Sequence, residues 1–146
     1  MAENGFGNDL VWLSVLVQRR YAQICADHDL TSAQATLLCA IKDRPQGMGE
    51  LAQLLGVAKN ALSGLVDRVE RLGLVRRETH ERDRRAITLT TTPLGEKVVG
   101  ALYADVAARM PDITAALSAD ERRRLADSVA RITSDAPQTA SRGHAG

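Results

Sequence analysis

Long hydrophobic runs, cysteines and aromatic residues are all scarce in this chain of 146 residues. No stretch approaches the roughly 18–20 consecutive apolar residues that a membrane span requires, and the first residues, MAENGFGNDL, lack the regions typical of a secretory signal. The two cysteines, Cys25 and Cys39, are too few for a disulfide framework. We therefore expect neither a membrane protein nor a secreted one, but a soluble chain in the reducing cytoplasm with no membrane partner.

Net charge gives little indication of a partner, because 19 basic residues almost balance 18 acidic ones. Only three of the basic residues are lysines, so 16 are arginines. The planar guanidinium of arginine suits phosphate groups and guanine edges, although an arginine excess also arises from GC-rich coding. Between Lys59 and Arg85 the balance shifts to eight basic residues against five acidic ones. This segment is where a polyanion would bind.

Apolar residues recur at steps of three and four along most of the chain, which is typical of amphipathic helices. The sequences Thr31-x-x-Gln34 and Ser118-x-x-Glu121 are capping boxes, and Thr92 precedes a proline suited to a first helical position. We expect Pro111 to interrupt the helix that begins there. The predicted helices cover residues 9–26, 31–41, 49–56, 58–72, 92–110 and 118 to about 134.

One segment has a different pattern. Residues 74–77 and 86–90 are β-branched or alternating, and a charged tip at residues 79–84 separates them, which predicts a β-hairpin. The order of elements predicts a mainly α fold with a small β-hairpin wing: a winged helix-turn-helix flanked by N- and C-terminal dimerisation helices. We expect residues 31–92 to form the winged helix-turn-helix, residues 1–30 and 93–135 the dimerisation region, and residues 136–146 a disordered tail.

The helix at residues 58–72 carries its apolar residues on one side and short polar or basic ones on the other. A helix that enters the DNA major groove needs such polar groups near its N-terminus. Asp67 shares this face and would repel phosphate, so we expect it to brace Arg71 or another arginine. The alternative is a polar face that contacts only solvent and no DNA. The candidate DNA-binding residues here are Lys59, Asn60, Ser63, Gly64, Arg68 and Arg71.

The hairpin tip supplies the second group of candidates. Arg82, Arg84 and Arg85 on a narrow loop could follow the phosphate backbone or enter a narrow minor groove, which attracts arginine. Asp83 is expected to brace the tip through backbone amides or an arginine. The alternative is an ordinary charged turn that does not contact DNA, and the polar helix beside the hairpin argues against this alternative.

A series of short motifs at characteristic spacing resembles the MarR (multiple antibiotic resistance regulator) family over residues 9–133. The resemblance implies a homodimeric winged-helix regulator, a repressor or an activator, that binds a pseudo-palindromic operator in double-stranded DNA and is often released by a small aromatic or phenolic effector. It also implies that Arg84 enters the minor groove. One departure is Thr91, where the family usually has leucine. The motifs are Thr31-x-x-Gln34, Glu50-Leu51-Ala52-x-x-Leu55-Gly56-Val57, Leu62-Ser63-x-Leu65-Val66-Asp67-Arg68, Gly73-Leu74-Val75-x-Arg77, Asp83-Arg84-Arg85 and Thr92-x-x-Gly95.

Dimerisation also follows from geometry, since two recognition helices about 34–36 Å apart match successive turns of one DNA face. The apolar stripes of the first and last helices have no partner inside so small a winged unit, although a monomeric bundle is the alternative. An effector pocket would lie where these helices meet the winged unit. Its candidate lining residues, which could equally be core or dimer contacts, are Trp12, Leu16, Tyr21 and Leu38.

Other chemistry has little support. Free cysteines are usually small buried apolar residues, but a redox-sensing regulator is an alternative because Arg19, Arg20 or His28 could favour a thiolate at Cys25. The histidines and cysteines lack metal-ligand spacing, and no catalytic set, phosphate-binding loop or cofactor motif stands out, so we expect no enzyme, metal or cofactor. A winged helix that binds only proteins is the second alternative.

Overall fold

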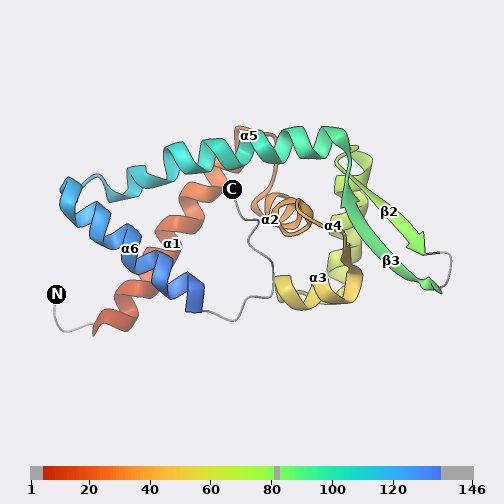
Figure 1. Ribbon diagram of the computed structural model, residues 1–146, viewed down its shortest axis with the longest axis horizontal. Helices are drawn as coiled ribbons and strands as arrows, with labels where there is room; N and C mark the ends of the chain where they lie inside the picture. The colour runs from red at the N-terminus through yellow and green to blue at the C-terminus, as the bar shows by residue number, and fades with distance from the viewer. Residues whose placement is uncertain (1–4, 81–82, 136–146) are drawn as a thin grey trace.

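The computed structural model describes residues 5–80 and 83–135, with the side chains of residues 80 and 83–85 left out. The chain is mainly helical with one small antiparallel sheet, which confirms the predicted fold class (Figure 1). The elements are α1 (Gly5–Ala26), α2 (Ser32–Ile41), β1 (Gln46–Gly47), α3 (Met48–Leu55), α4 (Lys59–Arg71), β2 (Val75–His80), β3 (Asp83–Thr91), α5 (Pro93–Arg109), the 3₁₀ helix η1 (Met110–Thr114) and α6 (Ala119–Asp135).

The predicted helix starts are confirmed by their hydrogen bonds. The Thr31 hydroxyl accepts from the Gln34 amide at 3.1 Å, and the Gln34 side chain accepts from the Thr31 amide at 3.0 Å. The same reciprocal pair joins Ser118 and Glu121. The Thr92 hydroxyl accepts from the Gly95 amide at 3.0 Å. These contacts satisfy amides that the first turn of a helix leaves without a partner.

Two predicted boundaries were wrong. Helix α1 begins at Gly5 rather than residue 9, because the apolar stripe marks only where a helix can pack and not where it starts. The hairpin is longer than predicted, and most of the charged segment 79–84 lies in paired strands, with Thr79 opposite Ile87. A strand ladder joins main-chain groups, so charged residues do not by themselves end it.

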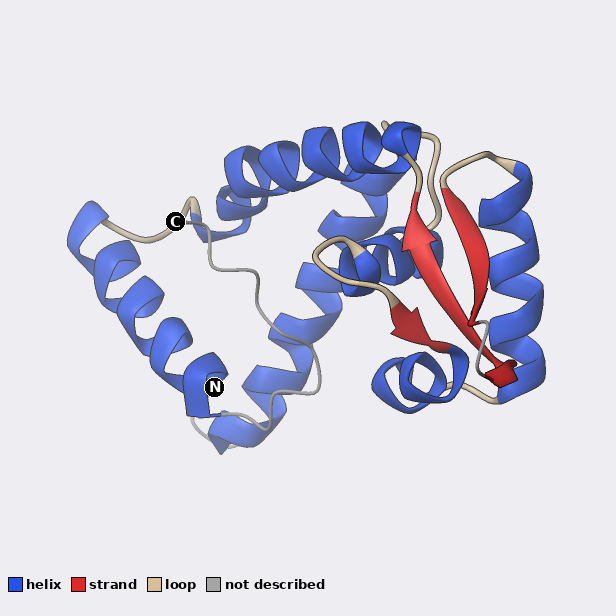
Figure 2. Ribbon diagram, turned by 45° about the vertical axis from the view of Figure 1, so that its right-hand side comes forward, coloured by secondary structure: helices blue, strands red, loops and turns tan. Residues whose placement is uncertain are grey.

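The sheet has the order β1-β3-β2 with all pairs antiparallel. Strand β1, which the sequence analysis missed, pairs Gln46 with Leu89 and Gly47 with Thr88. Two residues are too few to show an alternating pattern. Figure 2 shows the strands with α4 along one side and α2 and α3 along the other.

The core lies in this winged part of the chain. Leu38, Leu62 and Leu89 are completely buried, as are most apolar side chains on the inner faces of α2, α3 and α4. The C-terminal end of α1 and the middle of α5 complete the core, and Cys25 is buried there as a small apolar residue. Cys39 is half-buried.

Helices α1 and α6 extend away from the winged part, and α5 runs between the two regions (Figure 1). No residue of α6 is buried, and on α1 only Ile24 and Cys25 are. The apolar residues of the N-terminal half of α1 are exposed, led by Phe6 at 75% and Trp12 at 67%. Among the described residues, no helix is both long enough and apolar enough to cross a membrane.

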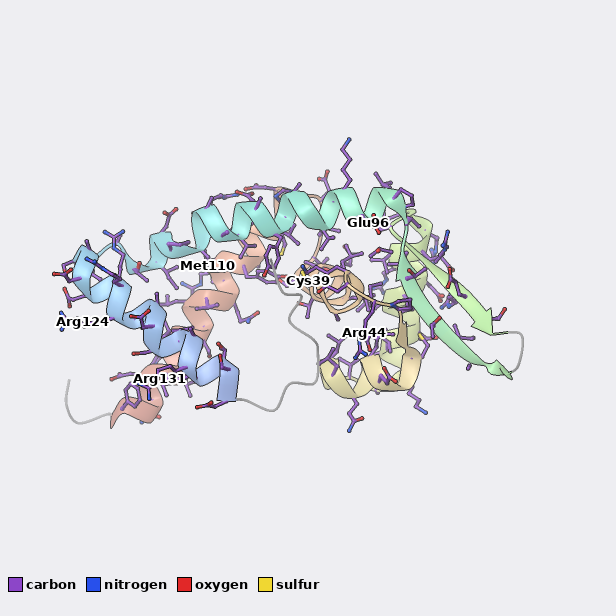
Figure 3. All side chains as sticks on the ribbon, viewed as in Figure 1. Cys39, Arg44, Glu96, Met110, Arg124 and Arg131 are labelled. Carbon is purple, nitrogen blue, oxygen red and sulfur yellow. The ribbon has the colours of Figure 1, made fainter. Side chains whose placement is uncertain are left out.

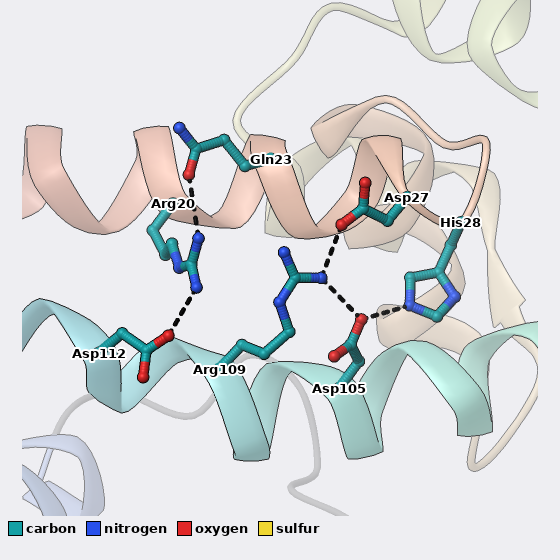
Figure 4. Close-up of polar contacts among 7 residues, drawn as sticks. All are labelled: Arg20, Gln23, Asp27, His28, Asp105, Arg109 and Asp112. Carbon is teal, nitrogen blue, oxygen red and sulfur yellow. Dashed lines mark hydrogen bonds and ion pairs between the residues drawn. The ribbon is translucent and has the colours of Figure 1, made fainter.

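A series of ion pairs joins α1 and the turn after it to α5 and η1 (Figure 4). Arg109 contacts Asp27 at 2.7 Å and Asp105 at 3.0 Å, and His28 Nε2 lies 2.9 Å from Asp105 Oδ2. The hydrogen bond from His28, reinforced by Arg109, lowers the pKa of Asp105. These pairs fix the direction of α1 relative to the helix that follows the wing. Arg20 and Asp112 extend the same series at 2.7 Å, because Pro111 turns the chain into η1 there.

Candidate nucleic-acid interface

Helices α3 and α4 form the helix-turn-helix. Gly56 ends α3 with φ = 66°, a left-handed conformation that glycine adopts at little cost. The Val57 amide then donates to the Ala52 carbonyl at 3.1 Å, which closes the turn. Helix α4 begins two residues later and buries Leu62 and Val66 against the core. This packing leaves the opposite face of α4 turned to solvent.

The predicted polar residues of α4 share that outer face. Lys59, Asn60, Ser63, Arg68 and Arg71 are exposed. Gly64 is half-buried, and a Cβ atom at this position would meet nothing within 4 Å. Space is therefore open in front of the backbone there. Together with Gly64 these exposed residues make up the outward half of α4, where Lys59 and Arg68, nine residues and thus about 180° apart around the helix, lie at opposite edges.

Asp67 braces an arginine, as the sequence analysis expected, and the partner is Arg77 on β2. Arg77 Nη2 lies 2.7 Å from Asp67 Oδ1, and Nη1 lies 2.7 Å from Glu70 Oε1. The Arg77 backbone amide also donates to Glu70 Oε2 at 3.3 Å. The hydrogen bond to Asp67 raises the pKa of the Arg77 guanidinium. One cation thus joins the wing to α4.

Sequence analysis assigned no role to Arg77 or Glu70. Arg77 is a strand residue ten positions from Asp67, so no helical spacing relates the two side chains. The available signal was the acidic residue on an otherwise basic face, which predicted Arg71 or another arginine as the partner, and the structure has Arg77 rather than Arg71.

The wing candidates lie largely outside the described residues. Arg82 is not described, and neither are the side chains of Asp83, Arg84 and Arg85. The backbone places residues 83–85 at the start of β3, where the hairpin turns. Nearer its base, Arg76 pairs with Glu78 on the exposed side of β2 at 3.0 Å.

The four candidate pocket residues do not line one cavity in the single chain. Leu38 is completely buried, Tyr21 is half-buried, and Trp12 is exposed. Leu16 lines a hollow of about 260 Å³ between α1 and η1, together with Arg19, Arg20, Gln23 and Ile113.

The cysteine environment favours inert thiols. Burial raises the pKa of both Cys25 and Cys39, and it also raises the pKa of the neighbouring Tyr21 hydroxyl. Because the thiolate is the reactive form, a raised pKa slows oxidation. Among the described residues, no group of three or more histidine, cysteine or acidic side chains is arranged to hold a metal ion.

Comparison with known proteins gives consistent results. The sequence profile of the MarR family matches residues 28–86. The fold is that of apo MarR from E. coli, with a TM-score of 0.82 at 24% identity, covering 88% of this chain and 96% of that one. The transcriptional regulator Tm0710 from Thermotoga maritima is 30% identical, with a TM-score of 0.65 and coverage of 88% and 92%. The transcriptional repressor CouR, solved on a 23-mer DNA duplex, is 27% identical, with a TM-score of 0.74 and coverage of 90% and 94%.

Proposed function

Because this chain belongs to the MarR family of DNA-binding transcriptional regulators, we propose that it is a homodimeric repressor that binds a pseudo-palindromic operator and is released by a small aromatic or phenolic ligand. It is not an enzyme, and we place its work in the cytoplasm. The observation that carries the proposal is the exposed polar face of α4, held beside the hairpin through Arg77.

Helix α4 enters the major groove in this proposal. Asn60 and Ser63 are short polar side chains on exposed positions near its N-terminus, suited to hydrogen bonds with base edges. The open space in front of Gly64 admits a close approach to DNA. Lys59, Arg68 and Arg71 supply positive charge to the flanking phosphates. Residues 31–92 are thus the DNA-binding unit.

The wing acts beside this helix. Arg84 enters the minor groove, Arg82 and Arg85 follow the backbone, and Asp83 stiffens the tip. The anchored position of Arg77 supports this arrangement, because it holds the hairpin at a constant angle to α4.

A second copy of the chain covers the exposed helices. The apolar side chains of α1, and Val129 and Ile132 on α6, form a surface that a monomer leaves in water. Isologous pairing through residues 1–30 and 93–135 buries this surface and repeats the recognition helix along the duplex. A ligand bound between these helices and the winged unit would change the separation of the two recognition helices. The ligand would then shift operator affinity by the difference between its own affinities for the two separations of the recognition helices.

Selection of bound duplexes from a random library, followed by sequencing, tests the function. We expect an inverted repeat whose half-sites lie about 10–10.5 base pairs apart. Ser63→Ala should then change base preference by about 1–3 kcal/mol at one position of each half-site, whereas Arg84→Ala should weaken binding mainly at A·T-rich flanks. A wild-type protein that enriches no duplex at low salt would contradict the proposal and leave a protein-binding winged helix.

A further inference from the structure

A hollow of about 730 Å³ opens beside the polar face of α4. Lys59 and Ser63 of α4 form one wall, residues 86–88 of β3 form a second, and the segment from Arg44 to Glu50 forms the third. Figure 3 shows Arg44 in this third segment, between α2 and α3. The hollow therefore joins the candidate DNA-reading face to a part of the chain that carries another arginine.

Arg44 is held by a buried amide. Gln46 is only 3% exposed, and in the orientation that suits its neighbours its side-chain nitrogen donates to Glu50 Oε2 at 2.9 Å. Its side-chain oxygen accepts from Arg44 Nε at 3.2 Å. Gln46 is itself fixed in the sheet by pairing with Leu89. One of the five N–H groups of Arg44 is thus used for positioning, and the four on its two Nη atoms remain for another acceptor.

The charge around the hollow suits an anion. Arg44 is exposed, and the ion pairs among the described residues include neither Arg44 nor Lys59. Among the described residues of the lining, Glu50 is the only acidic one, and Gln46 occupies one of its oxygens. Two cations therefore face one partly satisfied carboxylate across a solvent-open space.

The position of Arg44 identifies the anion. In a helix-turn-helix complex the second helix lies in the major groove while the first crosses the DNA backbone. Arg44 precedes α3, the first of these helices, by four residues, and it shares a hollow with Lys59 at the start of α4. We propose that Arg44, positioned by Gln46, binds a phosphate of the DNA strand that flanks the groove holding α4. This inference rests on the proposed function and adds a contact from outside the helix-turn-helix and the wing.

The salt dependence of binding tests this contact. Wild type, Arg44→Ala and Arg124→Ala are titrated by fluorescence anisotropy against the tightest duplex that wild type selects from a random library, between 0.05 and about 0.3 M salt. Arg124→Ala removes the same charge from α6, far from α3 and α4 (Figure 3). Each phosphate contact contributes about 0.9 to the slope of log K against log salt, and a dimer has two copies of Arg44. We expect Arg44→Ala to reduce this slope by about 1.8, and Arg124→Ala to leave it unchanged.

Two further variants test whether Arg44 contacts a phosphate or whether its replacement merely unfolds the protein. Arg44→Lys retains the charge and should recover most of the slope, while Gln46→Met keeps the buried volume, removes the brace and should weaken binding on all duplexes alike. Base preference in a repeated selection should be the same for Arg44→Ala as for wild type, because phosphates carry no sequence information. An unchanged slope in a folded Arg44→Ala protein overturns the inference while leaving the proposed function intact. If wild type itself binds no duplex, the proposed function fails, and this contact fails with it.

Discussion

The winged part of the molecule and its two extended helices use the same sequence pattern with opposite results. Apolar residues at steps of three and four bury Leu38 and Leu62 completely in the winged part. On α1 and α6 the same spacing leaves Leu10 and Ile132 exposed, at 46% and 65%. The periodicity of a helix thus reports that one face will be buried, but it does not say whether the covering surface belongs to the same chain.

The two regions also differ in what holds them in place. The winged part is fixed by a shared apolar core and by the sheet, with Arg77 as a polar link between α4 and β2. Helix α1 is tied to α5 and η1 through the ion pairs of Arg20 and Arg109 with their carboxylate partners, and no residue of α6 is buried. We therefore expect substitutions in the winged part to change stability and substitutions on the extended helices to change assembly.

The largest effect is expected from a charge on α1. Trp12→Glu should produce monomers in sedimentation and lower affinity for a two-half-site duplex by about 100-fold or more, because the second half-site then binds independently. The circular dichroism spectrum should remain that of a folded chain, since Trp12 is outside the core. Leu94→Glu is the matched control, as Leu94 is 51% exposed at the start of α5 beside the winged part. A dimeric Trp12→Glu protein would refute the assignment of this surface.

Two glycines of α5 lie in different surroundings, one crowded and one open. A Cβ at Gly95 would collide with the Leu74 carbonyl oxygen, whereas a Cβ at Gly100 would meet nothing within 4 Å. Gly95→Ala should lower the free energy of unfolding by about 3 kcal/mol, because the obstacle is backbone. Gly100→Ala should raise it by about 0.5–1 kcal/mol through helix propensity. Urea denaturation measures both, and equal effects would mean that α5 does not pack closely on the strand connection.

The wing brace should have a smaller effect. Arg77→Met removes contacts to two carboxylates that are themselves 49% and 38% exposed, so solvent screens much of their energy. We expect a loss of about 1 kcal/mol in the free energy of unfolding, which 0.5 M salt should reduce. Arg76→Met is the neighbouring control, since Arg76 pairs only with Glu78 and is 62% exposed. If Arg77→Met and Arg76→Met had the same free energy of unfolding, the ion pairs of Arg77 would not be what holds the wing.

The smallest expected effect is a pH-dependent change in stability at the α1–α5 junction. Folding lowers the pKa of Asp105, chiefly through His28, so this carboxylate stabilises the fold above its unfolded pKa of about 3.9 and loses that contribution as pH falls through the lower folded value. Melting temperatures of wild type and Asp105→Asn should therefore differ at pH 7 and converge below pH 4. A difference that stays constant down to pH 2.5 would show that the charge of Asp105 plays no part.

Prediction from sequence succeeded where the cause is local. The capping boxes at Thr31 and Ser118 and the break at Pro111 each depend on a few neighbouring residues, and all three are confirmed. It failed for β1 and for the ends of the hairpin, which exist because distant strands pair. The DNA-contact candidates remain predictions, although the structure does place those on α4 on one exposed face.

The sequence by itself determined which segments become helices, where the capped ones start and which side of each is apolar, because these follow from contacts between residues three or four apart. Only the tertiary structure decided that Asp67 and Glu70 hold Arg77, that Gln46 holds Arg44, and that the N-terminal half of α1 stays uncovered. Such relations depend on the direction in which one element crosses another. That direction is set by the packing of the whole core, which no short stretch of sequence contains.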